Sequence, residues 1–92
     1  MSRRYKYVPL EVMRACARAI DQSTTIARLG NPNAASDVKV ALELLRAGLR
    51  GALANVEINL GSVKDKEYAA HVKAETENLI ENAEKGVRSA GL

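Results

Sequence analysis

Apolar residues recur every three or four positions along most of the chain, which is the spacing of one face of an α-helix. Pro9 fits the first position of a helix, because the N–H that proline lacks has no partner there. Gly30 fits the residue just beyond the end of that helix. The longest uninterrupted pattern covers residues 34–60, and Gly61 ends it. These signals predict two long helices joined by a turn.

A third helical pattern occupies residues 63–89. Ser62 followed by Asp65 resembles a capping box, in which side chains bind the free N–H groups at the start of a helix. No stretch has the strict alternation of a β-strand. The sequence therefore predicts an all-α fold of three long helices in a single domain, residues 1–92.

The first two predicted helices have apolar sectors much wider than one core-facing stripe. One stripe on each helix carries most of its charged residues: Glu11, Arg14, Arg18, Asp21, Thr25 and Arg28, then Lys39, Glu43, Arg46, Arg50 and Glu57. The third helix has only a narrow apolar stripe: Tyr68, Val72, Leu79, Ala83 and Val87. Because one narrow stripe cannot cover two wide sectors, we predict a homo-oligomer, most simply a two-fold dimer that forms a larger helical bundle.

A row of small and polar residues on the second helix needs a partner. Ala47, Gly51, Asn55 and Asn59 follow one another at intervals of four. Glycine inside a helix costs about 1 kcal/mol relative to alanine, so Gly48 and Gly51 indicate close approach of another backbone. If this helix is central, the two amides must find polar partners inside the protein.

Charge and cysteine content narrow the functional classes. The net charge of +3, from 14 basic and 11 acidic residues, permits an anionic ligand but does not predict nucleic-acid binding. A basic arm with two tyrosines in residues 1–7, together with the stripe that carries Arg14 and Arg18, favours nucleic acid, but acidic residues are interspersed on the same stripes. The single cysteine, Cys16, excludes an internal disulfide and favours a reducing cytoplasm. Because there is no apolar run of membrane-spanning length and no secretory signal, we expect no membrane partner. Because acidic residues are interspersed with the basic ones, we expect no nucleic-acid partner.

Three segments together resemble one enzyme family: VPLEVMRAC (Val8–Cys16), GNPNAASDVKVA (Gly30–Ala41) and GALANVEINLGSVKD (Gly51–Asp65). In order and spacing they are similar to the cyclodeaminase/cyclohydrolase family, which includes the C-terminal domain of formiminotransferase-cyclodeaminase and free-standing methenyltetrahydrofolate cyclohydrolases. Members are all-helical domains of roughly twice this length. The resemblance covers only their C-terminal half, so we expect a half-domain whose folate groove is completed by a second copy or by a missing segment.

The resemblance implies a tetrahydrofolate derivative as substrate. Members close formiminotetrahydrofolate to methenyltetrahydrofolate with release of ammonia, or interconvert methenyl- and formyltetrahydrofolate with water. Both reactions move a proton at a folate nitrogen, and neither requires a metal. The sequence offers no metal-ligand set, since His71 and Cys16 lack ligand spacing.

Asp37 is the candidate catalytic residue, either as acid/base or as counter-charge to the cationic folate centre. The candidate substrate-binding residues are polar side chains of the turn and of the second helix: Asn31, Asn33, Ser36, Asn55 and Asn59. Structural roles explain the same residues, because a carboxylate suits a first helical turn and Asn33 is a good N-cap. The alternative to a folate enzyme is therefore an inactive helical oligomerisation module that keeps only the family fold.

Overall fold

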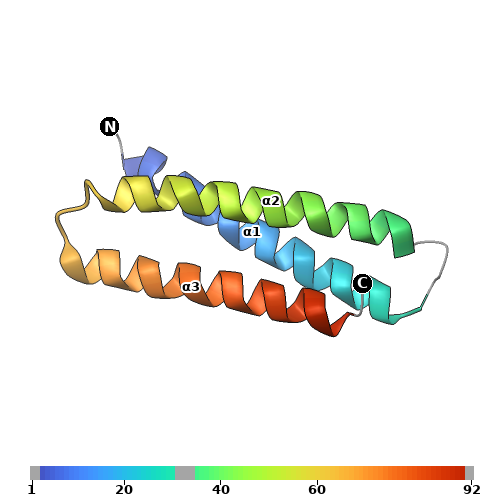
Figure 1. Ribbon diagram of the computed structural model, residues 1–92. Helices are drawn as coiled ribbons and strands as arrows, with labels where there is room; N and C mark the ends of the chain where they lie inside the picture. The colour runs from blue at the N-terminus through green and yellow to red at the C-terminus, as the bar shows by residue number, and fades with distance from the viewer. Residues whose placement is uncertain (1–2, 31–34, 91–92) are drawn as a thin grey trace.

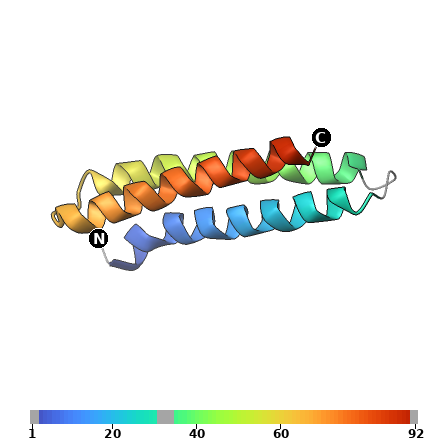
Figure 2. The same ribbon diagram turned by 90° about the horizontal axis from the view of Figure 1, so that it is seen from below.

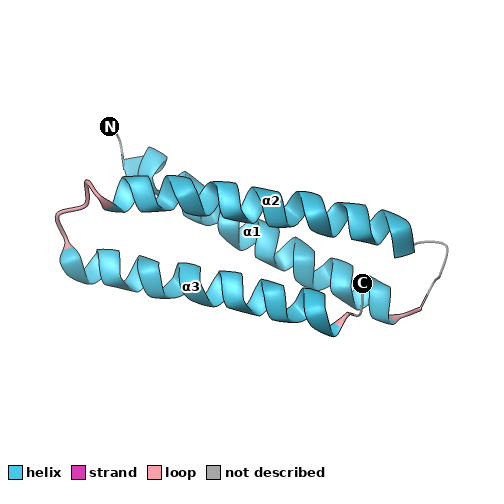
Figure 3. Cartoon of the chain, viewed as in Figure 1, coloured by secondary structure: helices cyan, strands magenta, loops and turns pink. Residues whose placement is uncertain are grey.

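The computed structural model describes residues 3–30 and 35–90. It contains three helices in an up-down-up arrangement, α1 (Arg3–Arg28), α2 (Ala35–Leu60) and α3 (Lys66–Ser89), as Figure 1 shows. No strand occurs in the described part of the chain (Figure 3). The prediction of an all-α fold with three long helices is confirmed.

The helix that contacts both others is α1. It packs most extensively against α2, less against α3, and α2 and α3 contact each other least. Figure 2 shows α1 running alongside the other two helices. The core is formed by ten buried apolar residues drawn from all three helices: Leu10, Met13, Ile20, Val38, Leu42, Leu49, Ala52, Val56, Val72 and Ala83. As predicted, α3 contributes only a narrow stripe to it.

The first helix begins earlier than predicted. It starts at Arg3 and contains Pro9, so the assignment of Pro9 to the first helical position is wrong. A proline inside a helix removes one backbone hydrogen bond and crowds the preceding turn. Only one to two turns precede Pro9, and that loss falls near the helix terminus, where the first N–H groups already have no partner in the helix. The other end is as predicted, because α1 stops at Arg28 and Gly30 has φ +78°.

The third helix begins later than predicted, at Lys66 rather than at residue 63. Asp65 is its N-cap: one carboxylate oxygen accepts a hydrogen bond from the backbone N–H of Tyr68 at 3.1 Å. The capping box that assigned the cap to Ser62 is therefore wrong. The hydroxyl of Ser62 instead donates to the carbonyl of Asn59 at 3.0 Å, in the turn after α2.

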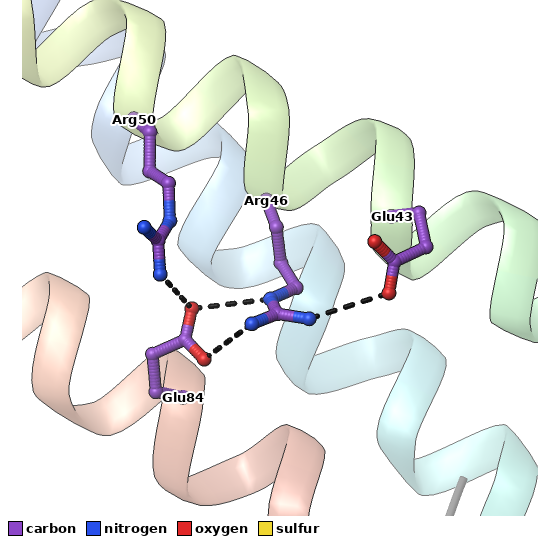
Figure 4. A network of polar contacts seen from close by, with 4 residues as sticks. All are labelled: Glu43, Arg46, Arg50 and Glu84. Atoms are coloured by element: carbon purple, nitrogen blue, oxygen red, sulfur yellow. Dashed lines mark hydrogen bonds and ion pairs between the residues drawn. The ribbon is translucent and has the colours of Figure 1, made fainter.

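Two clusters of ion pairs fasten α3 to the other helices. Arg14 on α1 forms a two-bond ion pair with Glu75, with 2.7 Å between Nη2 and Oε1. Arg46 on α2 binds Glu84 through two bonds, 2.8 Å from Nη2 to Oε2 and 3.1 Å from Nε to Oε1. Arg50 adds a third bond to Glu84 at 3.3 Å, as Figure 4 shows. These bidentate contacts fix the position of α3 along the rod.

Candidate functional site

The candidate acid/base, Asp37, lies in the first turn of α2. Its side chain and that of Ser36 are exposed to solvent. The N-terminal end of a helix carries partial positive charge, so an acidic side chain suits this position. Asn31 and Asn33, the other candidates at this end, lie outside the described residues, and so does the predicted N-cap role of Asn33.

The remaining two candidates, Asn55 and Asn59, lie near the opposite end of α2. Asn55 is exposed, so the expectation of a buried amide with an internal partner is wrong for this residue. Asn59 is half-buried. Asn55 is exposed because α1, and not α2, is the helix that contacts both others, so part of the surface of α2 faces solvent.

Within one chain, the candidates do not form one site. Asp37 and Asn55 are eighteen residues apart on the same helix. At 1.5 Å per residue they are separated by about 27 Å, and five full turns bring both side chains to the same side of α2. A single folate nitrogen cannot touch both ends. The sequence could place these residues on one face of a helix, but residue type and motif alone did not show that they are too far apart to share one site.

A second feature with room for a ligand is an open groove of about 560 Å³ between α2 and α3. Its lining combines apolar and charged side chains: Leu53, Glu57, Leu60, Lys73, Thr76, Glu77, Ile80 and Glu81. This volume lies within the range of small-molecule sites. Three carboxylates can accept hydrogen bonds from an amino-substituted heterocycle, and Lys73 can attract an anion.

Sequence reasoning missed this groove. It assigned Glu57 to the polar stripe of α2, and it identified only the apolar stripe of α3, which does not include Lys73, Glu77 or Glu81. The i, i+4 spacing of the three α3 residues was the available signal, because it places them on one side of that helix. Nothing local, however, shows that this side borders α2.

Arg14 and Arg46 determine the pKa values of the glutamates with which they form ion pairs. The hydrogen bond from Arg14 lowers the pKa of the Glu75 carboxyl, and the hydrogen bond from Arg46 lowers the pKa of the Glu84 carboxyl. The same bonds raise the pKa values of both guanidinium groups. Both carboxylates are therefore held ionised and fully engaged, which suits a structural role better than proton transfer. The charge of Arg46 is thus already paired within the chain, with Glu84 and Glu43.

The two residues examined in the sequence for ligand spacing, Cys16 and His71, lie on different helices. Cys16 is half-buried on α1 and packs against the core as a small apolar residue. His71 is exposed on α3. Among the described residues, no group of three or more histidine, cysteine, aspartate or glutamate side chains is placed to hold a metal ion.

Sequence comparison decides the family. The profile of the formiminotransferase-cyclodeaminase family matches residues 2–78, which is most of the chain. The chain belongs to the formiminotransferase-cyclodeaminase family. The predicted resemblance is thereby confirmed. No solved structure gives a significant match.

The relatives of the chain include proteins of two kinds, methenyltetrahydrofolate cyclohydrolases and formimidoyltransferase-cyclodeaminases. The chain is 38% identical over 76 residues to a methenyltetrahydrofolate cyclohydrolase of Methylorubrum extorquens, which covers 83% of the chain and 36% of that relative. It is 28% identical to a formimidoyltransferase-cyclodeaminase of Dictyostelium discoideum, over 88% of the chain and 15% of the relative. A formimidoyltransferase-cyclodeaminase of Sus scrofa is 34% identical, over 83% of the chain and 14% of the relative.

The chain thus spans about a third, or less, of the length of these relatives. Most of the length of each relative therefore has no counterpart in these 92 residues. None of the helices in residues 3–30 and 35–90 has an apolar stretch of the length that a bilayer-spanning helix needs.

Proposed function

We propose that the chain is a folate-dependent protein of the cyclodeaminase or cyclohydrolase type, which acts on formimino- or methenyltetrahydrofolate. The observation that carries this proposal is the 38% identity, over most of the chain, to a methenyltetrahydrofolate cyclohydrolase. Because the chain covers 36% of that relative, we infer that it works as an oligomer or together with a missing half. The single cysteine favours the cytoplasm as its location.

In this proposal Asp37 carries the proton chemistry. Cyclisation with loss of ammonia, and hydration of a methenyl bridge, both need a base or acid within hydrogen-bond reach of the reacting folate atoms. An exposed carboxylate at the start of α2 can reach a ligand without first breaking an ion pair with α3. At that end of α2, Ser36 with Asn31 and Asn33 provides hydrogen bonds for the pteridine, whereas Asn55 and Asn59, at the other end of α2, contribute only from a second copy in an oligomer. No metal takes part in this scheme.

Ligand binding tests the proposal directly. A ligand that binds only the folded state raises the melting temperature, so formyl- or methenyltetrahydrofolate should stabilise the wild-type chain. Asp37→Asn should abolish turnover. Asp21→Asn is the matched control, because it removes another exposed helical carboxylate and should leave turnover unchanged. Absence of both binding and turnover in the wild type would overturn the assignment.

The second candidate function is an inactive helical module. The short span relative to the curated relatives favours it. This version predicts a stable assembly whose melting temperature does not respond to any folate and whose folding does not respond to Asp37→Ala. If folate binds but Asp37→Asn has no effect, the groove between α2 and α3 is the next place to mutate.

A further inference from the structure

The groove between α2 and α3 is short and closed at both ends. The residues that line it come from 53–60 of α2 and 73–81 of α3, so it is about 10–12 Å long at 1.5 Å per residue. One turn beyond it, Arg50 binds Glu84 and joins the two helices (Figure 4). At the other end, the turn that follows α2 connects them (Figure 1). Because neither a helix nor an extended chain can run through a space closed in this way, the groove suits a small molecule.

The deeper part of the groove is apolar. Leu53, Leu60 and Ile80 line it, are half-buried and pack against the hydrophobic core. A ring or an alkyl chain that lies on these three side chains would remove apolar surface of both the protein and the ligand from water. The groove therefore favours a ligand with an apolar body.

The polar side chains of the groove mainly accept hydrogen bonds. Glu57, Glu77 and Glu81 are exposed along its edges, and carboxylates have no hydrogen to donate. Thr76 is only 4% exposed, and its hydroxyl already donates to the carbonyl of Lys73 at 2.8 Å, so toward a ligand it can only accept. Among the described residues that line the groove, only the ammonium group of Lys73 has hydrogens left to donate. A well-matched ligand therefore brings its own donors.

The groove also differs in charge from the chain as a whole. Three carboxylates against one ammonium group leave a net charge of −2 along the groove, whereas the chain carries +3. The ion pairs found in residues 3–30 and 35–90 use other side chains, so these four charges remain available to a ligand. An excess of unpaired negative charge favours a cation.

Glu57 and Glu77 lie at about the same level on neighbouring helices. Arg50 and Glu84 mark a common level, because they bind each other across α2 and α3. Glu57 follows Arg50 by seven residues, and Glu77 precedes Glu84 by seven residues. Since the two helices are antiparallel, equal steps keep the two glutamates level (Figure 1). Their like charges repel each other, and a cation between them would replace this repulsion with attraction.

We propose that the groove between α2 and α3 binds an amphipathic organic cation. The apolar body of the ligand lies on Leu53, Leu60 and Ile80, and its ammonium or amidinium group lies between Glu57 and Glu77. Such a ligand supplies the apolar surface, the hydrogen-bond donors and the positive charge that the lining of the groove lacks.

This site is separate from the candidate folate site and goes beyond the proposed function. Glu57 and Asp37 are twenty residues apart on α2, which separates them by about 30 Å. The glutamate tail of a folate is anionic, and the net negative charge of the groove disfavours it. Either proposal can therefore fail while the other holds.

Tryptamine is a suitable probe, because it joins an ammonium group to an aromatic body. The chain contains no tryptophan, so the indole emission of the probe reports its binding to the 92-residue chain. Tryptamine should bind about tenfold more tightly than neutral tryptophol, anionic indole-3-propionate or ethylamine, which lacks the ring and is measured by displacement. No binding of tryptamine, or equal binding of the three indoles, overturns the proposal.

Charge variants test where the cation lies. Glu57→Gln and Glu77→Gln should each weaken tryptamine binding by about fivefold, whereas Lys73→Gln should strengthen it by about twofold. Glu67→Gln is the matched control, an exposed glutamate of α3 outside the groove, and should leave the Kd unchanged. All four substitutions change exposed side chains, and circular dichroism checks that each variant is folded. Weaker binding by Lys73→Gln, or equal effects of Glu67→Gln and Glu77→Gln, overturns the proposal.

Competition with methenyltetrahydrofolate distinguishes the groove from the folate site. If the folate binds and tryptamine stays bound, the two sites are separate, as proposed. If the folate displaces tryptamine, the groove belongs to the folate site, and its assignment to a different ligand is overturned. If no folate binds, the proposed function fails, while the tryptamine titrations still decide what the groove binds.

Discussion

Arg46 and Glu84, on different helices and 38 positions apart in sequence, form a two-bond ion pair with 2.8 Å and 3.1 Å between their atoms. It is one of the few contacts between α2 and α3. Glu84 is only 19% exposed and also accepts from Arg50. This carboxylate therefore holds together two helices that share little apolar surface.

Removal of that carboxylate should destabilise the fold modestly. Glu84→Gln should lower the free energy of unfolding by about 1 kcal/mol, since the pairs are partly exposed but bidentate. Urea denaturation at fixed protein concentration measures the change. Glu81→Gln, an exposed glutamate on the same helix, is the control and should have almost no effect. Equal losses in the two variants would contradict the assigned role of Glu84.

Acid should weaken the fold through two glutamates. The pKa values of Glu75 and Glu84 are lowered in the folded chain by their arginine partners. Their contribution is fully present above the unfolded value of about 4.3 and is lost as the pH falls through the lower folded values. The arginines stay protonated throughout and add no pH dependence. The urea midpoint should therefore drop from about pH 5 downwards, and less steeply in the Glu75→Gln, Glu84→Gln double variant.

The two helical glycines should respond differently to alanine. Gly51→Ala should stabilise the isolated subunit by about 1 kcal/mol, because the helix gains propensity and the added Cβ meets no atom. Gly48→Ala should gain less, since its Cβ would stand 3.2 Å from the Cys16 sulfur. Cys16→Ala should relieve that crowding, so thermal unfolding of Gly48→Ala, Cys16→Ala and their combination should show non-additive free energies. Additive values would show that the sulfur and the new methyl group do not meet.

The start of α3 should depend on Asp65 and not on Ser62. Asp65→Ala removes the oxygen that accepts the Tyr68 N–H and should cost about 1 kcal/mol. Ser62→Ala removes only an exposed hydroxyl bond to a carbonyl and should cost a few tenths. Chemical denaturation of the two variants distinguishes them. The reverse order would restore Ser62 as the cap.

The three helices were predicted from residues near one another in sequence, and the errors in that prediction concern where two of the helices begin. Gly30 and Gly61 mark the ends of α1 and α2 because the chain turns there, and periodicity identified all three helices. Pro9 and Ser62 misled because a proline or a serine is compatible with more than one position near a helix start. Neighbouring residues cannot decide between those positions when the competing turns differ by about 1 kcal/mol.

The candidate site was less predictable, for a geometrical reason. Its residues were assigned from motif and residue type, and the structure separates Asp37 from Asn55 by most of the length of α2. The pairing of Arg46 with Glu84 and the groove beside Leu53 and Ile80 depend on how α2 and α3 lie relative to each other. That arrangement is set by packing on α1, which no spacing within one helix reveals.

The sparse contact between α2 and α3 has a kinetic consequence. α1 and α2 are consecutive and pack extensively, so their hairpin can form from nearby segments, with α3 joining afterwards mainly on α1. The same order in reverse makes α3 the first helix to open. Its backbone amides should exchange with deuterium faster than those of α2, at a rate set by partial opening rather than by unfolding of the whole chain.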